Sequence, residues 1–123
     1  MKADDRVLQR LEEVGRAAVL VPQPVLAEIS YGISRLPRSR RKQDLSTLYA
    51  RVVQEFERPL WTDEVSARFG ETKAWLEKHG KRLEDFDIAI AAHALALDAI
   101  LVTANSRHMI RIPKLEIEDW QSS

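Results

Sequence analysis

Apolar residues along the N-terminal part of the chain change from helical spacing to a short continuous run. Residues 4–14, "DDRVLQRLEEV", place their apolar side chains on one helical stripe, and acids stand in the first turn. This pattern predicts an amphipathic helix that Gly15 ends. Residues 17–22, "AAVLVP", form an uninterrupted apolar run rich in valine, which predicts a strand buried on both faces.

Helical spacing returns in the middle of the chain. Segments 24–36 and 39–56 each repeat apolar residues at intervals of three and four, and each predicts a helix. Residues 58–62, "RPLWT", predict a strand from a weaker pattern. Thr62 is placed to cap a further helix, with acids in its first turn and Gly80 after its end.

The C-terminal part predicts a helix over 85–98, a strand over 99–103 and a last short strand over 115–120. Strands separated by helices indicate crossover connections and a parallel sheet that is covered on both faces. We therefore expect an α/β fold with a parallel sheet flanked by helices. At 123 residues, the chain fits a single domain over 1–123.

Several oxygen-bearing side chains are expected at one edge of this sheet. The helix 85–98 meets the strand 99–103 across almost no loop, so the two must run antiparallel. Asp85 and Asp87 then lie at the carboxyl edge, where ligands bind in open α/β sheets. Asn105 follows the same strand, and Glu28 follows the strand 17–22 by little more than one helical turn.

Carboxylate and amide oxygens in this arrangement suit hard cations such as Mg²⁺ or Mn²⁺, which can promote hydrolysis of a phosphodiester. The alternative for Asp85 and Asp87 is that they only cap a helix and complement its dipole. Glu28 stands in the apolar segment "VLAEI", where a carboxylate is unfavourable unless it faces solvent. His93, in "IAAHALAL", is interpreted as a core residue.

Composition narrows the class of protein without naming a partner. Nineteen basic and nineteen acidic residues cancel, so a polyanion would have to meet a local patch. One such patch is "RLPRSRRK", in which Arg38, Arg40, Arg41 and Lys42 could contact RNA phosphates or simply form a solvated helix start. The chain has no cysteine and no apolar run long enough to span a membrane, which predicts a cytoplasmic protein without a membrane partner.

Three segments carry a family resemblance: "PVLAEISYG", "HGKRLEDFDIAIAAHALALDAILVTAN" and "LEIEDW". They resemble the PIN-domain toxins of the VapC family, which are metal-dependent ribonucleases paired with VapB-type antitoxins. The resemblance covers residues 5–120 and implies a three-layer PIN-like fold, a homodimer and Mg²⁺ or Mn²⁺ as cofactor. It implies that Glu28, Asp87 and Asn105 are catalytic residues, and that Glu28 and Asp87 bind the metal, with Asp85 ranked behind them.

The resemblance also implies a first, central strand that ends in an "LDTN"-like motif and supplies a principal metal ligand. This sequence begins at "MKADDRVLQRL" and lacks that strand. The chain is then either a fragment or mis-started frame of an active toxin, or a shortened form that has lost catalysis. The first reading predicts an Mg²⁺-dependent endoribonuclease toxin of a VapBC system. The second predicts a catalytically deficient module that dimerises or binds an antitoxin.

Overall fold

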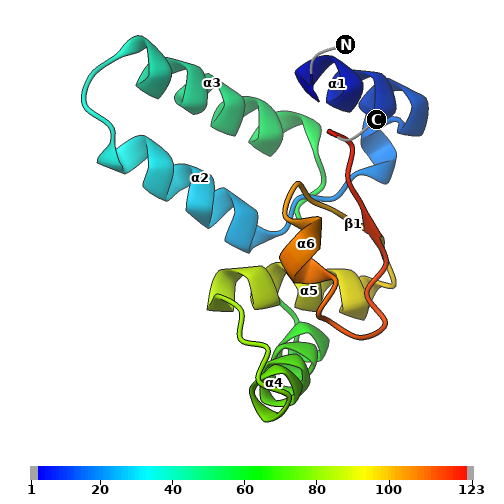
Figure 1. Ribbon diagram of the computed structural model, residues 1–123. Coiled ribbons are helices and arrows are strands. Elements are labelled where there is room, and N and C mark those ends of the chain that lie inside the picture. The colour runs from blue at the N-terminus through cyan, green and yellow to red at the C-terminus, as the bar shows by residue number, and fades with distance from the viewer. Residues whose placement is uncertain (1–2, 122–123) are drawn as a thin grey trace. The chain divides into compact units, whose positions relative to one another are not determined.

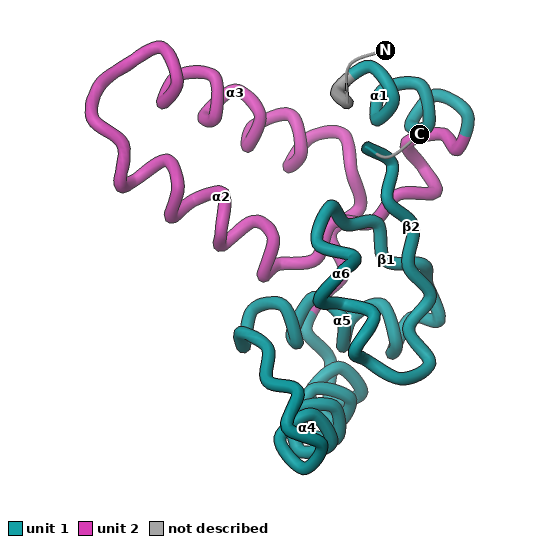
Figure 2. Tube along the Cα trace, viewed as in Figure 1, with its two compact units in different colours: residues 1–13, 61–123 teal, residues 14–60 magenta. Residues whose placement is uncertain are grey.

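A computed structural model describes residues 3–121 of the chain (Figure 1). The chain divides into two compact units, which Figure 2 colours separately. The first unit combines residues 1–13 with 61–123, and the second comprises residues 14–60.

The second unit is built mainly from two packed helices. A 3-10 helix spans Arg16–Ala18, and two α-helices follow, α2 over Gln23–Arg35 and α3 over Arg40–Glu55. The Ser39 side chain caps α3 by accepting a hydrogen bond of 3.1 Å from the Lys42 amide. Both helices therefore confirm the predictions for 24–36 and 39–56.

The strands predicted over 17–22 and 58–62 are wrong as continuous strands. The structure has only one parallel bridge there, between Leu20 and Glu57, with the Val21 amide donating to the Glu57 carbonyl at 2.9 Å. The physical reason lies in the prolines that follow, since Pro22 and Pro59 have no N–H to continue a ladder. The first residues of the apolar run form the 3-10 turn instead.

The first unit contains the remaining helices. They are α1 over Ala3–Val14, α4 over Asp63–Lys78, α5 over Asp85–Leu97 and the short α6 over Ser106–Met109. The Thr62 hydroxyl caps α4 by accepting from the Val65 amide at 3.3 Å, as predicted. The sequence pattern did not predict α6.

Two short parallel strands complete the first unit. They are β1 over Leu101–Val102 and β2 over Ile117–Glu118, and they pair in the register Leu101 to Ile117 and Val102 to Glu118. These strands confirm the predictions for 99–103 and 115–120 in shortened form. The fold is therefore α/β, mostly helical, with a small parallel sheet. No helix within 3–121 is both long and apolar enough to cross a membrane.

Helix α5 forms the centre of the first unit's core and is covered on more than one side. It packs along α4, and its buried residues join a cluster that also contains Leu101 of β1 and Met109 of α6 (Figure 1). Ala91 and Ala92 are fully buried, because small side chains let neighbouring elements approach the helix closely. Because several elements cover the helix, apolar residues are needed on more than one of its faces.

His93 is a core residue, as predicted, with 2% of its surface exposed. Its Nδ1 lies 2.8 Å from the Ala89 carbonyl oxygen, which can only accept, so Nδ1 carries the hydrogen. The ring packs edge-on against Trp61, with 5.4 Å between centroids. The other ring nitrogen, Nε2, is buried and has no hydrogen-bond partner among residues 3–121.

The C-terminal strand is held to α1 by a small polar cluster. Arg10 donates to Glu118 at 3.1 Å and to Glu13 at 2.9 Å, and its guanidinium lies over the Trp120 ring. Hydrogen bonds from the Trp120 indole and from Arg10 lower the pKa of Glu118 below its ordinary value of 4.5. The hydrogen bonds to Glu13 and Glu118 raise the pKa of Arg10.

This cluster predicts an acid-dependent contribution to stability. Because the folded-state pKa of Glu118 is lowered, its contribution is present above pH 4.5 and is lost as the pH falls through the lower folded-state value. Glu118→Gln should therefore melt below the parent chain at pH 7, and the difference should shrink on acidification. Thermal unfolding followed by circular dichroism from about pH 3 to pH 7 measures this difference. Glu116→Gln, at an exposed carboxylate of the same segment, is the control, and an unchanged gap at low pH would contradict the prediction.

Candidate functional site

The start of α5 and the end of β1 are brought to one place by the turn between them. Asp98 caps α5 in the left-handed conformation with φ of 52°, which a short polar side chain tolerates. The Ala99 amide then donates to the Ala94 carbonyl at 2.8 Å, and the chain enters β1 within three residues. The helix consequently runs back along the strand, as the sequence predicted.

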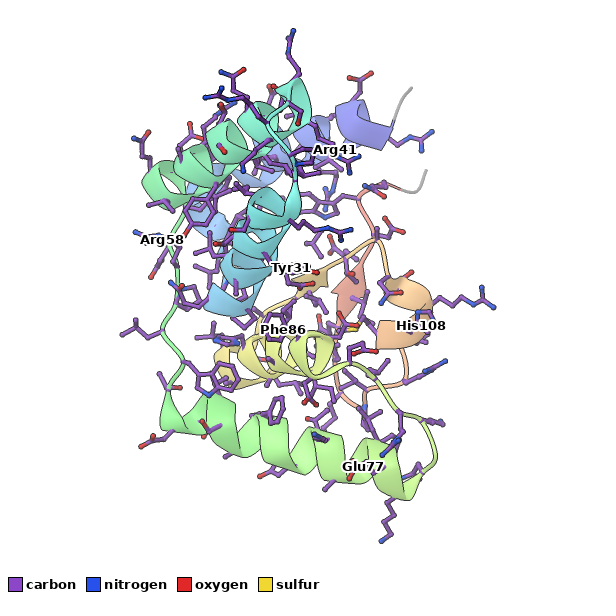
Figure 3. All side chains as sticks on the ribbon, turned by 90° about the vertical axis from the view of Figure 1, so that its left-hand side faces the viewer. Tyr31, Arg41, Arg58, Glu77, Phe86 and His108 are labelled. Carbon is purple, nitrogen blue, oxygen red and sulfur yellow. The ribbon has the colours of Figure 1, made fainter. Side chains whose placement is uncertain are left out.

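A pocket of about 740 Å³ lies in the first unit, bordered by the starts of α5 and α6 and by the C-terminal part of α4. Asp85, Asp87 and Asn105 all line it, so the structure brings together these three predicted site residues. Figure 3 labels Glu77 and His108, which also line this pocket from α4 and α6. The catalytic and metal-binding roles of the three residues stay predictions.

The two aspartates of α5 differ in their surroundings. Asp85 is exposed and forms an ion pair with the Lys73 ammonium, with 2.9 Å between Nζ and Oδ1. Asp87 is half-buried, and it forms no ion pair within the described chain. Neither carboxylate accepts a capping bond, since the N-cap is Glu84 and no side-chain cap bond is formed there. Their position in the first helical turn still complements the helix dipole.

Asn105 stands between β1 and α6 and is fixed by its own backbone. Its amide donates to the Thr103 hydroxyl at 2.9 Å, and its carbonyl accepts from the amides of His108 and Met109. Its side-chain Oδ1 lies 2.6 Å from Nδ1 of His108. The asparagine is thus held at the pocket by contacts on both its backbone and its side chain.

Glu28 lies in the other unit, on α2. Its side chain is exposed and forms no hydrogen bond or ion pair among the residues that the structure describes. Exposure removes the energetic conflict that a buried carboxylate in "VLAEI" would create. A shared site with Asp87 stays a prediction.

The predicted RNA-contacting cations also belong to the second unit. Arg38, Arg40 and Arg41 are exposed, and Figure 3 labels Arg41 near the start of α3. Arg40 forms only a loose ion pair of 3.9 Å with Asp44. Lys42 has a local structural contact, because its ammonium donates to the Leu36 carbonyl at the end of α2 at 3.2 Å.

Basic side chains on the pocket wall were missed by the sequence reasoning. Lys73, Arg82, His108 and Arg111 all line the pocket beside its acids. Arg111 donates to the Arg82 carbonyl at 3.1 Å and has no acidic partner within residues 3–121. One signal was available in the sequence, since "SRHMIR" places three basic residues directly after Asn105.

The carboxylate oxygens in the pocket are ligands of the kind that a hard cation such as Mg²⁺ binds. Magnesium is commonly held by one or two carboxylates together with waters and substrate phosphates. Asp87 can supply one such carboxylate, whereas Asp85 is already neutralised by Lys73. In the described part of the chain no group of three or more His, Asp or Glu side chains is arranged to hold a metal ion.

Comparison with known proteins gives a consistent picture. The family model of the PIN domain matches residues 2–115. The chain is 29% identical over 102 residues to Ribonuclease VapC2 of Rickettsia felis, covering 83% of this chain and 74% of that protein. It is 28% identical over 116 residues to Ribonuclease VapC1 of Haemophilus influenzae strain R2866, covering 94% of this chain and 82% of that protein.

A solved structure shares the fold. The crystal structure of VapBC2 from Rickettsia felis, bound to a DNA fragment from its promoter, contains a chain that matches with a TM-score of 0.81 and 29% identity. The match covers 94% of this chain and 86% of that chain. The PIN-domain match extends through both compact units, and the relatives carry the name VapC. This chain therefore belongs to the PIN-domain family, among relatives that are VapC ribonucleases.

Proposed function

We propose that this protein is the toxin of a VapBC-type toxin–antitoxin system and acts as an Mg²⁺-dependent endoribonuclease on cytoplasmic RNA. The observation that carries the proposal is the pocket in which Asp87, an acid without an ion-pair partner among the described residues, lies with Asn105 among cationic side chains. The relatives named VapC ribonucleases support the same reaction.

The chain's own residues would divide the work of phosphodiester hydrolysis. Asp87 and Glu28 would hold the cation, which when bound activates water and neutralises charge at the phosphodiester. Lys73 holds Asp85 at 2.9 Å and so offsets one negative charge of the pocket. Arg111 and Arg82 offer positive charge to an RNA backbone that enters the pocket.

Replacing Asp87 tests this assignment. Asp87→Asn removes a charged metal ligand, and we expect cleavage of a fluorophore-labelled RNA hairpin to fall by about 100-fold, the scale seen when a key charge-stabilising group is removed. Titration calorimetry with Mn²⁺ should show weaker binding. Asp85→Asn is the matched control and should lose much less, because Lys73 already neutralises that carboxylate.

The outcomes of this experiment separate the two functional readings. Equal cleavage by the parent chain and Asp87→Asn would refute the assigned site. Absence of cleavage by the parent chain in Mg²⁺ and in Mn²⁺ would instead favour the alternative, a catalytically deficient PIN-like module that dimerises or binds an antitoxin.

Arg111 provides a second prediction because it is a pocket cation without an acidic partner in the described structure. Arg111→Ala should weaken binding of single-stranded RNA and lower the slope of log K against log salt by about 0.7 for one lost phosphate contact. Fluorescence anisotropy in EDTA, where no cleavage is expected, measures both quantities. Lys78→Ala removes the same charge from the exposed end of α4, and an equal loss there would contradict the assignment.

The cationic run before α3 remains a second proposed RNA contact. Arg38, Arg40 and Arg41 are exposed, and none has a close ion pair in the described residues. Lys42 is the weaker member, because its ammonium already binds a backbone carbonyl.

The second unit supports the proposed partners, a VapB-type antitoxin and a second copy of the chain. Helices α2 and α3 pack together, yet Tyr31 and Leu48 remain 66% and 46% exposed. An exposed apolar surface on a helix pair suits a partner helix. The structural neighbour from Rickettsia felis is a VapBC complex, which agrees with an antitoxin partner.

The exposed apolar side chains of α2 and α3 predict that the chain forms a dimer. We expect the parent chain to elute as a dimer, and we expect Tyr31→Ala and Leu48→Ala to shift it toward monomer because each removes apolar area from the interface. Size-exclusion chromatography with light scattering measures the change. Leu60→Ala, at a leucine that is 75% exposed but outside both helices, should leave the dimer intact. A monodisperse parent monomer would refute the dimer.

A further inference from the structure

The contact between Asn105 and His108 is unusual for a residue at a helix start. An asparagine at the N-cap commonly turns its side-chain oxygen to a free amide of the first turn. Asn105 is the N-cap of α6, yet its side chain makes no capping bond. Its oxygen instead lies 2.6 Å from Nδ1 of the His108 ring.

The chemistry of the two groups fixes the direction of this bond. An amide oxygen can only accept, so Nδ1 of His108 must carry the hydrogen and donate it. The Asn105 oxygen is therefore engaged, whereas its amino group has no hydrogen-bond partner within the described residues. The amino group of the side chain consequently offers the pocket a free hydrogen-bond donor.

From this geometry we infer that His108 is a positioning residue, which turns the Asn105 amide so that its amino group donates to a phosphate oxygen of the substrate. This inference rests on the proposed ribonuclease function. It deepens that function by giving Asn105 the role of a phosphate-binding donor. Both side chains line the pocket together with Asp87 and Arg111, so an anionic oxygen bound there would have a charged and a neutral donor available.

Three variants test the positioning role in the full chain. His108→Ala removes the donor, and we expect kcat/KM on the labelled RNA hairpin to fall about tenfold, as for loss of one orienting hydrogen bond. His108→Asn attaches an amino group to the same carbon that carries Nδ1, so it should recover most of the activity. His108→Gln places its donor one bond further out and should not.

A double-mutant cycle separates positioning from an independent contact with RNA. If His108 acts through Asn105, adding His108→Ala to Asn105→Ala should change kcat/KM by less than about twofold. Multiplying losses in the double variant would overturn the inference. Melting temperatures of all variants show whether a loss reflects unfolding.

A spectroscopic readout tests the contact without catalysis. The side-chain amide signals of Asn105, assigned by their loss in Asn105→Ala, should move in His108→Ala and stay near their parent positions in His108→Asn. Unmoved signals in His108→Ala would overturn the inference even if activity falls. If the parent chain cuts no RNA, the proposed function fails, whereas these signals still decide whether His108 orients Asn105.

Discussion

The burial of α5 is the constraint on which the rest of the first unit depends. Helix α5 carries apolar residues on more than one face, so several elements must cover it. Helix α4, strand β1 and helix α6 pack against these residues. Small residues such as Ala91 and Ala92 make the cover tight. Since buried groups in a close-packed core move little, the first turn of α5 is held rigidly at the pocket. The polar chemistry of the site thus derives its position from an apolar helix.

The position of the end of β1 is set by a short turn and by strand pairing. The left-handed turn at Asp98 sends the chain straight from α5 into the strand, and pairing with β2 then sets the strand's direction. Asn105 emerges where the strand ends, with its backbone held by Thr103 and by the first turn of α6. Two elements adjacent in sequence therefore bring Asp87 and Asn105 to one pocket without any long loop.

The sequence predicted the helices well because apolar spacing, the Thr62 cap and Gly80 are local signals. It predicted strands 17–22 and 58–62 wrongly, because a continuous strand needs partners and donors that local pattern does not reveal. The pocket residues Asp85, Asp87 and Asn105 followed from helix and strand direction. His108 and Arg111 were missed because they lie in and just after α6, a helix of only four residues that apolar spacing does not mark.

The pocket around Asp87 is lined by both acidic and basic side chains, a combination that suits both a cation and an anion. Two like unit charges 4 Å apart repel by about 4 kcal/mol at an effective dielectric constant of 20, so a phosphate would not approach a bare carboxylate. The Lys73 pair cancels Asp85, and Arg111 adds an unpaired positive charge in the described structure. The carboxylate of Asp87 has no ion-pair partner within residues 3–121, and a cation bound beside it would neutralise its charge. A pocket lined only by acids would repel an anionic substrate, and a pocket lined only by basic side chains would repel a cation.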